Sequence, residues 1–499
     1  MTDPVIRLAQ GEVRGLWRGA SAAFLGIPYA EPPVGPLRWA APVPASGWRG
    51  VLDATEFGAT PQRHPFGAVT AIPEPSYPGE ATLNLNVFTP ALGDPDAKLP
   101  VLVWIHGGGF KAGSHNSPWY DGRAFNRDGV VTVSISYRLG FDGFGVIDGC
   151  PDNRGLRDQV CALEWVRDNI AAFGGDPARV TIGGQSAGGF SVLALLASPL
   201  ASGLFAAAIA QSSPVEGRPI EVARTWTARL AELAGVEPTA SGLGALTEQT
   251  VLDLQDAIEG PLMPGAVDPV GLVDSFFAGE AITLPFVPVV GDEVLPVPIV
   301  EALASGRGAV PLLIGSTLHE FDMLGGFLAP LLGEVDAVTV LRASRVGGLA
   351  EAVRDEVADL PDAFALAHVN TMNAFRRPVA RVALVRSAST WVYDHRYRGV
   401  QSDGAPGLAG HCSELPFTFD CLDVEPAYVA AAAGVRPPPQ LAERMHADWV
   451  RFVTSHDPGW TPWRWGGTAM VYGDEPLAAE SLGYVVEQQL EEQTAPRER

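Results

Sequence analysis

The stretch VTIGGQSAGGFSVLALLAS, residues 180–198, changes from a strand pattern to an apolar helix pattern within a few residues. Ser186 lies at the change, with Gly184 two positions before it and Gly188 two positions after it. A strand that turns directly into a helix forces the corner residue into a strained backbone conformation and leaves no room for nearby side chains. We therefore predict that Ser186 is a nucleophile raised above its backbone, with the N–H of Ala187 aimed at any negative oxygen formed beside it.

Strand-like apolar runs surround this corner in the sequence. They cover residues 101–105, 130–136, 180–184, 206–211 and 311–316. Residues 155–173 carry apolar side chains at helical spacing between the second and the third run. This β-α-β alternation predicts an α/β protein with a large, mostly parallel central sheet and helices on both faces.

The rest of the chain shows no sign of a second domain. Residues 219–284 and 337–389 are alanine-rich with helical patterns, which we interpret as helical insertions around the sheet. No linker rich in glycine, serine and proline divides the chain. We expect one domain over residues 1–485 and a polar C-terminal tail over residues 486–499, more typical of a frayed helix than of a functional arm.

Composition excludes several classes of partner. The 499 residues carry 34 Lys and Arg against 57 Asp and Glu, a net charge of −23, which disfavours nucleic acid and anionic membranes. The chain shows no secretory signal pattern and no apolar run long enough to span a membrane, so we expect a cytoplasmic protein. Its four cysteines fit no metal-binding spacing and are expected as reduced thiols, with Cys150–Cys161 and Cys412–Cys421 bridges left as alternatives. No metal or organic cofactor is expected, and the oligomeric state does not follow from the sequence.

A second glycine cluster follows the first strand run. His106 is followed by Gly107, Gly108 and Gly109, and three glycines let a backbone approach a substrate closely. In an HGGG-type loop, N–H groups converge with the one that follows the nucleophile to form an oxyanion hole. We predict that Gly108, Gly109 and Ala187 are these donors and that Gly107 supports the loop.

These motifs belong to a longer pattern. The segments FLGIPYAEPPVGPLRW (24–39), SYRLGFDGFG (136–145), NIAAFGGDPARVTIGGQSAGG (169–189), GSTLHE (315–320) and HCSELPF (411–417) follow one another along the chain. In these segments the sequence resembles the type B carboxylesterase family, over about residues 5–475. The resemblance implies an α/β-hydrolase fold and a serine hydrolase that cleaves small-molecule carboxylic esters through an acyl-enzyme.

The resemblance also assigns the partners of the serine. A triad needs a base that takes the serine proton and a carboxylate that orients the base, in the chain order Ser, acid, His. Among nine histidines the family pattern places the base at His411, and it places the acid at Glu320, with Asp322 as the nearest rival. Glu414 matches a further acidic position and is expected to support the site. Gln185 stands where the family commonly has glutamate, which we expect to alter a buried polar network without abolishing catalysis.

Two other functions stay open at this point. The same machinery could attack a carbamate or an amide, or the scaffold could be a non-catalytic binding protein. Non-catalytic relatives lose the serine or the histidine, whereas this chain keeps both. Pocket shape depends on side chains in the insertions, among which we expect Trp119, Phe286, Phe321 and Phe327.

Overall fold

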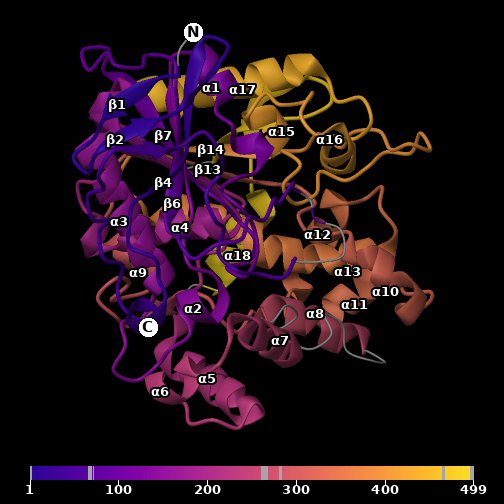
Figure 1. Cartoon of the computed structure of the whole chain (residues 1–499). Helices are drawn as coiled ribbons and strands as arrows, with labels where there is room; N and C mark the ends of the chain where they lie inside the picture. Colours follow the sequence, from indigo (N-terminus) through magenta and orange to yellow (C-terminus); the bar gives the residue numbers. More distant parts are fainter. Residues whose placement is uncertain are drawn as a thin grey trace.

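The computed structural model describes residues 3–65, 70, 72–259, 268–279, 284–463 and 467–494. An eleven-stranded sheet runs through the molecule in the order β16-β15-β14-β13-β10-β9-β7-β8-β6-β4-β3 (Figure 1). Its strands are β3 (Leu16–Arg18), β4 (Ser21–Pro28), β6 (Asn84–Thr89), β7 (Leu99–Ile105), β8 (Val131–Ile135), β9 (Gly175–Gln185), β10 (Ala207–Gln211), β13 (Leu312–Thr317), β14 (Thr390–His395), β15 (Thr468–Tyr472) and β16 (Ala478–Leu482). The strands from β15 to β8 are parallel, and the antiparallel pairs lie at the two edges. The prediction of a mostly parallel sheet is confirmed.

Two small sheets accompany the large one. The first has the order β1-β2-β5 and contains β1 (Val5–Arg7), β2 (Glu12–Arg14) and β5 (Val51–Asp53). The second pairs β11 (Arg218–Pro219) with β12 (Val289–Val290) in parallel. This second pair joins the two ends of the helical insertion that the sequence predicts over residues 219–284.

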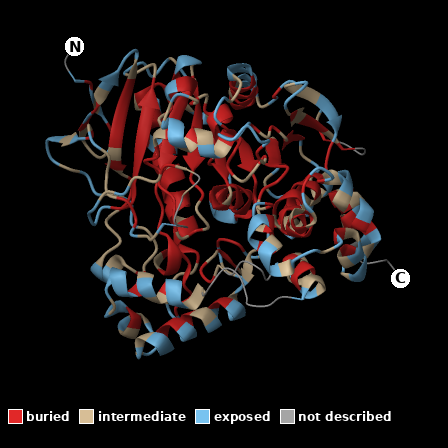
Figure 2. Ribbon diagram, turned by 90° about the vertical axis from the view of Figure 1, so that its right-hand side faces the viewer, coloured by how far each residue is buried: buried red, intermediate tan, exposed pale blue. Residues whose placement is uncertain are grey.

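The alternation of side chains along the strands creates two cores. In β7, Val101, Val103 and Ile105 belong to one buried cluster, whereas Leu102 and Trp104 belong to another. Successive side chains of a strand point to opposite faces, so both faces of the central strands must be covered. Figure 2 accordingly shows the strands almost entirely buried, while the outer faces of the surrounding helices are exposed.

Helices cover the sheet and extend it at one end. They are α1 (Arg123–Arg127), α2 (Gly140–Phe144), α3 (Arg154–Asn169), α4 (Ala187–Ala197), α5 (Ile220–Ala234), α6 (Ala240–Gly244), α7 (Glu248–Glu259), α8 (Pro269–Ala278), α9 (Ile299–Ala304), α10 (Leu324–Leu332), α11 (Ala337–Ala343), α12 (Ala350–Glu356), α13 (Asp362–Thr371), α14 (Arg377–Val385), α15 (Leu415–Thr418), α16 (Pro426–Ala433), α17 (Pro439–Ser455) and α18 (Val485–Thr494). Residues of α3, α4, α9 and α14 share the first core, and residues of α15 and α17 share the second. Helices α5 to α8 and α10 to α13 form the lower and right-hand part of the molecule in Figure 1.

The C-terminal segment differs from the expected polar tail. Helix α18 spans most of it, and Val486 and Leu490 are buried in a third core together with α8 and α10 to α13. Glu487 on the same helix is fully buried and ion-paired with Arg376. Residues 486 and 490 lie four positions apart on one helical face, so both apolar side chains face the third core. Residues 495–499 lie outside the described part of the chain.

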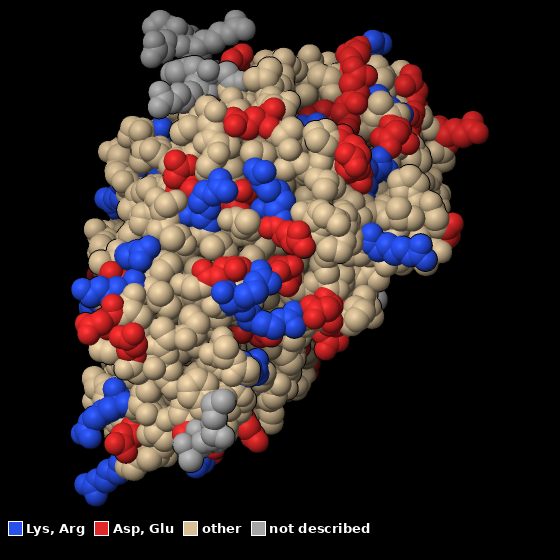
Figure 3. All heavy atoms as spheres, turned by 90° about the horizontal axis from the view of Figure 1, so that it is seen from above, with Lys and Arg blue, Asp and Glu red and all other residues tan. Residues whose placement is uncertain are grey.

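The surface seen from above carries charges of both signs (Figure 3), and the cysteines are unpaired. Seen from above, Lys and Arg side chains are interspersed with Asp and Glu rather than separated into patches (Figure 3). All four cysteines are free thiols. Within the described residues no single helix is both long and apolar enough to cross a bilayer, although α10 and α11, bent by 93° to each other, reach that length and composition as a pair.

Candidate active site

Ser186 occupies the corner between β9 and α4. Strand β9 ends at Gln185, helix α4 begins at Ala187, and Ser186 between them has φ 59° and ψ −122°. A Cβ on Gly184 would lie 2.5 Å from the carbonyl carbon of Gly188, and a Cβ on Gly188 would collide with the carbonyl oxygen of Ile105. The glycine after the serine is therefore required by the end of the neighbouring strand β7 as well as by the turn. The Ser186 N–H donates to the carbonyl oxygen of Gln211 at 2.9 Å, which fixes the corner against β10.

The glycine loop passes directly over this corner. It follows β7, and a Cβ on Gly107 would lie 2.6 Å from the carbonyl oxygen of Gln185 and 3.1 Å from Ser186 Cβ. Gly108 and Gly109 have φ values of 114° and 60°, which L-residues with side chains rarely adopt. In the part of the chain that the structure describes, the N–H groups of Gly108 and Gly109 donate to no protein acceptor. They are free to bind an oxygen of a ligand, as is the first N–H of α4.

Glu320 and His411 meet beyond the ends of β13 and β14. Glu320 is fully buried, and its Oε2 forms a short hydrogen bond with His411 Nδ1, whereas its Oε1 accepts the Thr317 N–H at 2.8 Å. The His411 N–H also donates to the carbonyl oxygen of Glu320 at 2.9 Å. Because β9, β13 and β14 are parallel, their carboxyl ends lie at one edge of the sheet and bring together residues 186, 320 and 411.

Asp322, the other candidate acid, faces α13 and not His411. Asp322 Oδ2 lies 2.9 Å from His368 Nδ1, and its Oδ1 accepts the Thr371 hydroxyl at 2.6 Å. Both carboxylate oxygens are therefore occupied on the side of α13, and Glu320 is the carboxylate paired with His411.

Gln185 lies within the same cluster. Its Nε2 is 3.3 Å from His411 Nε2, and its Oε1 accepts a hydrogen bond from Cys412 Sγ at 3.5 Å. Phe321 and Phe375 stack on each other and both contact the His411 ring, at centroid distances of 5.1 Å and 4.9 Å. Sequence reasoning missed both Cys412 and Phe375. The position of Cys412 directly after the histidine was a signal for the first, whereas Phe375 reaches the site through the π-helix η6 (Met372–Arg376), which no sequence pattern indicated.

The expected pocket aromatics separate into three groups. Phe321 contacts the His411 ring. Phe286 packs against Phe141, and the Trp119 indole donates to the carbonyl oxygen of Val424, so both belong to buried cores. Phe327 is 65% exposed on α10. Of the four, only Phe321 touches a residue of the predicted triad in the described contacts.

Glu414 is a buried acid whose pKa is raised toward neutral pH. Burial, and next the negative charge of Glu320, raise the pKa of Glu414 to about 7. Its Oε1 accepts from Gln211 Nε2 at 3.2 Å, and Gln211 Oε1 in turn accepts the Trp449 indole N–H at 2.9 Å. The protonated carboxyl adds no second negative charge beside Glu320.

We expect Glu414→Gln to stabilise the protein selectively at high pH. The pKa of Glu414 is raised from its ordinary value of 4.5, so the stability linked to this group is complete below pH 4.5 and is lost as the pH rises through about 7. The amide mimics the protonated acid and avoids the loss, which amounts to about 2 to 3 kcal/mol between pH 5 and pH 8.5. Thermal unfolding should give equal Tm values at pH 5 and a higher Tm for the variant at pH 8.5. The matched control is Glu293→Gln, whose side chain is 80% exposed; an equal offset at both pH values in Glu414→Gln would contradict the prediction.

The described residues offer no set of side chains that could bind a metal ion. No three or more His, Cys, Asp and Glu side chains are grouped there so that they could hold an ion. His106 in the glycine loop has its pKa lowered to about 4 by burial, and its Nδ1 lies 2.8 Å from the carbonyl oxygen of Gly107. His106 is therefore neutral, and its ring contacts the backbone of the glycine loop at Gly107.

Known proteins are similar to this chain over nearly its whole length. A model of the carboxylesterase family matches residues 2–341. The para-nitrobenzyl esterase of Bacillus subtilis (strain 168) is 34% identical over 476 residues, covering 93% of this chain and 92% of the relative. The phenmedipham hydrolase of Pseudarthrobacter oxydans is 35% identical over 510 residues, covering 95% and 96%. Among solved structures, a thermophilic PNB esterase has a TM-score of 0.80 at 30% identity, covering 98% of this chain and 99% of that one, and carboxylesterase EST55 of Geobacillus stearothermophilus has a TM-score of 0.77 at 29% identity, covering 97% and 99%.

Proposed function

Because this chain belongs to the carboxylesterase family, we propose that Ser186, His411 and Glu320 are the triad with which it cleaves carboxylic esters. The chain is a carboxylic ester hydrolase acting on small-molecule esters, and its order of serine, acid and histidine is that of the α/β-hydrolase fold. The observation that carries the assignment is the hydrogen bond between His411 Nδ1 and Glu320, with the opposite ring nitrogen turned toward the residue adjoining Ser186.

The reaction begins with proton transfer from Ser186. As Ser186 Oγ forms a bond to the ester carbonyl carbon, its proton passes to His411 Nε2 and Glu320 stabilises the imidazolium. The carbonyl electron pair moves onto oxygen, where the N–H groups of Gly108, Gly109 and Ala187 bind it. When the tetrahedral intermediate collapses, the bond to the alcohol oxygen breaks and His411 donates its proton to that oxygen.

Water then releases the acid. His411 Nε2 takes a proton from water as the water oxygen attacks the acyl carbon, and the same three N–H groups bind the second oxyanion. Collapse breaks the bond to Ser186 Oγ, which recovers the proton from His411. Gly107 has a supporting role, since any side chain there would contact the Ser186 Cβ.

A covalent serine probe tests the assignment without reference to a particular substrate. A fluorophosphonate should modify one residue per chain, peptide mass mapping should place the adduct on Ser186, and ester turnover should fall in proportion to labelling. His411→Ala should react with the probe at least about 100-fold more slowly, since the base contributes about 10² to 10⁴. An adduct on another serine, or full turnover after complete labelling, would contradict the assignment. Absence of any labelling would favour the non-catalytic alternative.

A second substrate class is favoured by one relative. The likeness to a protein named phenmedipham hydrolase makes phenmedipham a compound to test beside para-nitrobenzyl esters, after the other relative. Matched ester, carbamate and anilide substrates, compared by kcat/KM, separate ester cleavage from attack on the other two groups. A chain-length series of acyl esters then gives the acyl preference.

A further inference from the structure

The turn that follows the glycine loop folds back onto the loop. Gly108 O accepts the N–H groups of Lys111 at 3.1 Å and of Ala112 at 2.9 Å. A Cβ on Gly108 would collide with the carbonyl group of Ala112 and would lie 2.7 Å from the nitrogen of Gly113. The peptide group between Ala112 and Gly113 therefore packs directly on Gly108.

The direction of each proposed oxyanion donor depends on the carbonyl group of the same peptide. In a planar trans peptide the C=O and the N–H point in opposite directions. The peptide that carries the Gly108 N–H has Gly107 O at its other end, 2.8 Å from His106 Nδ1. A Cβ on Gly113 would collide with this oxygen. The peptide that carries the Gly109 N–H ends in Gly108 O, which the turn binds, so the backbone at residues 112 and 113 supports both donors.

Glu74 holds the supporting peptide from outside the turn. Its Oε2 accepts the Gly113 N–H at 3.0 Å and lies 3.7 Å from Arg63 Nε. The Arg63 side chain is 4% exposed, and its Nη2 donates to the carbonyl oxygens of Glu74 at 2.8 Å and Pro75 at 3.0 Å. A buried arginine therefore fixes the segment from which Glu74 reaches the turn.

An ion pair anchors the turn at a second point. Lys111 Nζ pairs with Glu259, the last residue of α7. Both side chains are 17% exposed, so the pair is largely shielded from water. Because this anchor does not involve residue 74, loss of the Glu74 carboxylate should loosen the peptide at Gly113 without unfolding the turn.

We propose that Glu74 is a positioning residue that orients the oxyanion donors through the Gly113 N–H. The proposal rests on the roles assigned above to Ser186 and to the N–H groups of Gly108 and Gly109. The carbonyl oxygen of a bound ester is neutral and gains little from close donor alignment, whereas the charged oxygen of the tetrahedral intermediate gains much more. Glu74 therefore acts on kcat rather than on substrate binding.

Three substitutions at residue 74 separate the hydrogen bond from the charge. Glu74→Ala removes the acceptor and should lower kcat for a nitrophenyl ester by about 10- to 100-fold, with KM within about 2-fold of the parent. Glu74→Gln keeps an acceptor oxygen at the same reach and should retain kcat within about 3-fold. Glu74→Asp keeps the charge beside Arg63 but withdraws the oxygen by the length of a methylene group, so its kcat should fall nearly as far as that of Glu74→Ala.

A trifluoromethyl ketone gives a readout that does not depend on turnover. Its carbonyl carbon forms a bond to Ser186 Oγ, the serine proton passes to His411, and the carbonyl electron pair moves onto oxygen to give a hemiketal oxyanion in the proposed hole. In Glu74→Ala the inhibition constant of this ketone should rise by the factor by which kcat/KM falls, whereas that of the product alcohol should stay within about 2-fold of the parent. Loss of folded protein would lower the active fraction and change neither constant.

Glu31→Ala is the matched control for the loss of a carboxylate that accepts a backbone N–H. Glu31 Oε1 accepts the Ser46 N–H at 2.7 Å on the segment that follows β4, so this variant should keep the parental kcat and the parental inhibition by the ketone. The proposal is overturned if Glu74→Ala matches Glu31→Ala, if its loss lies in KM alone, or if Glu74→Asp retains more activity than Glu74→Gln.

Two further outcomes are distinguishable from these. If Glu74→Ala fails to fold, the comparison of Glu74→Gln with Glu74→Asp decides the question, because the first keeps the hydrogen bond and the second keeps the charge. If the triad assignment itself is wrong, the parent enzyme forms no ketone adduct with Ser186, whereas failure of the role of Glu74 alone leaves that adduct intact in every variant.

Discussion

Replacing Ser186 with alanine should lower kcat/KM for a nitrophenyl ester by about 10⁴- to 10⁶-fold. The variant lacks the oxygen that forms the acyl-enzyme, so only substrate binding and the oxyanion donors remain to accelerate direct attack by water. Stability should hardly change, since the corner is held by backbone bonds from Ser186 N to Gln211 O at 2.9 Å and from Phe190 N to Ser186 O at 2.8 Å. Alanine retains both bonds. Steady-state kinetics and a thermal scan on the same preparation measure the two quantities together.

Ser191→Ala is the control for this change. Ser191 lies on the same helix α4, is buried, and accepts a hydrogen bond from Gln159 Nε2 at 3.0 Å. Its removal should cost about 1 kcal/mol of stability through the unpaired amide and leave ester turnover near the parental rate. If Ser186→Ala retained parental turnover while Ser191→Ala lost it, the nucleophile would have to be sought elsewhere on the helix.

The central sheet could be predicted because each of its strands has a local signal in the sequence, a continuous apolar run. Continuous apolar runs at 101–105, 206–211 and 311–316 correspond to β7, β10 and β13, which end within a residue or two of the expected positions. The predicted helix over 155–173 corresponds to α3 followed by a 3-10 turn, Ile170–Phe173. The corner at Ser186 was equally visible, because glycine two residues to either side is a local requirement of the turn.

The contacts that complete the site could not be predicted, because they join residues far apart in the sequence. Phe375 reaches His411 only through the geometry of a π-helix, and the bond between Cys412 and Gln185 spans more than 200 positions. The polar pattern of residues 486–499 concealed the buried face of α18 in the same way. Glu487 belongs to this polar pattern, yet it is buried and ion-paired with a basic side chain in the core.

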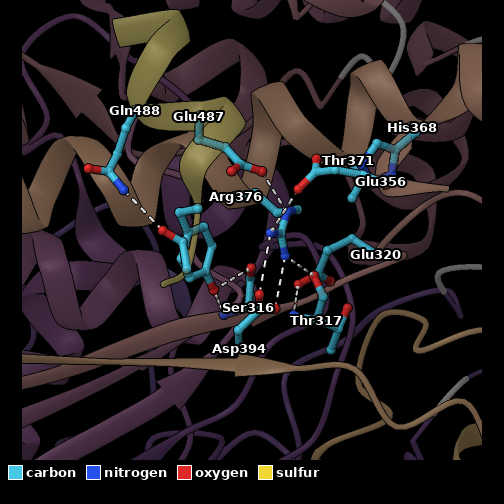
Figure 4. Close-up of polar contacts among 12 residues, drawn as sticks. Ser316, Thr317, Glu320, Glu356, His368, Thr371, Arg376, Asp394, Glu487 and Gln488 are labelled. Carbon is cyan, nitrogen blue, oxygen red and sulfur yellow. Dashed lines mark hydrogen bonds and ion pairs between the residues drawn. The ribbon is translucent and has the colours of Figure 1, made fainter. Parts of the chain in front are cut away.

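That side chain is Arg376, which contacts residues of β13, β14 and α18 close to Glu320 (Figure 4). It is fully buried, its Nε donates to Glu487 Oε1 at 2.6 Å, and its Nη1 donates to Asp394 Oδ1 at 3.0 Å. Burial alone would raise the pKa of Asp394, but the positive charges of Arg376 and Arg396 overcome it and lower that pKa to about 2. Arg376 Nη1 also reaches the carbonyl oxygen of Thr317 at 3.5 Å, and the N–H of Thr317 binds Glu320.

Arg376→Met should therefore be the most destabilising of the substitutions considered, by about 3 to 5 kcal/mol in the free energy of unfolding. Methionine fills much of the volume but leaves Glu487 buried without its cation and leaves Asp394 paired with Arg396 alone. Urea-induced unfolding followed by tryptophan fluorescence measures the loss. Arg342→Met is the control, because the Arg342–Glu351 pair is exposed on both sides and should contribute less than about 1 kcal/mol.

Arg376→Met should lower the catalytic rate as well as the stability. Arg376 follows Phe375, which packs on the His411 ring, and it holds the strand end that binds Glu320. Folded Arg376→Met should consequently lose kcat on esters by about 10- to 100-fold, since small displacements of reacting groups are costly, while Arg342→Met should not. Glu487→Gln in the Arg376→Met background should restore part of the stability by removing the unpaired charge. Equal urea midpoints for Arg376→Met and Arg342→Met would show that the buried carboxylates find protons or partners without the arginine, and that the cation is dispensable to the site.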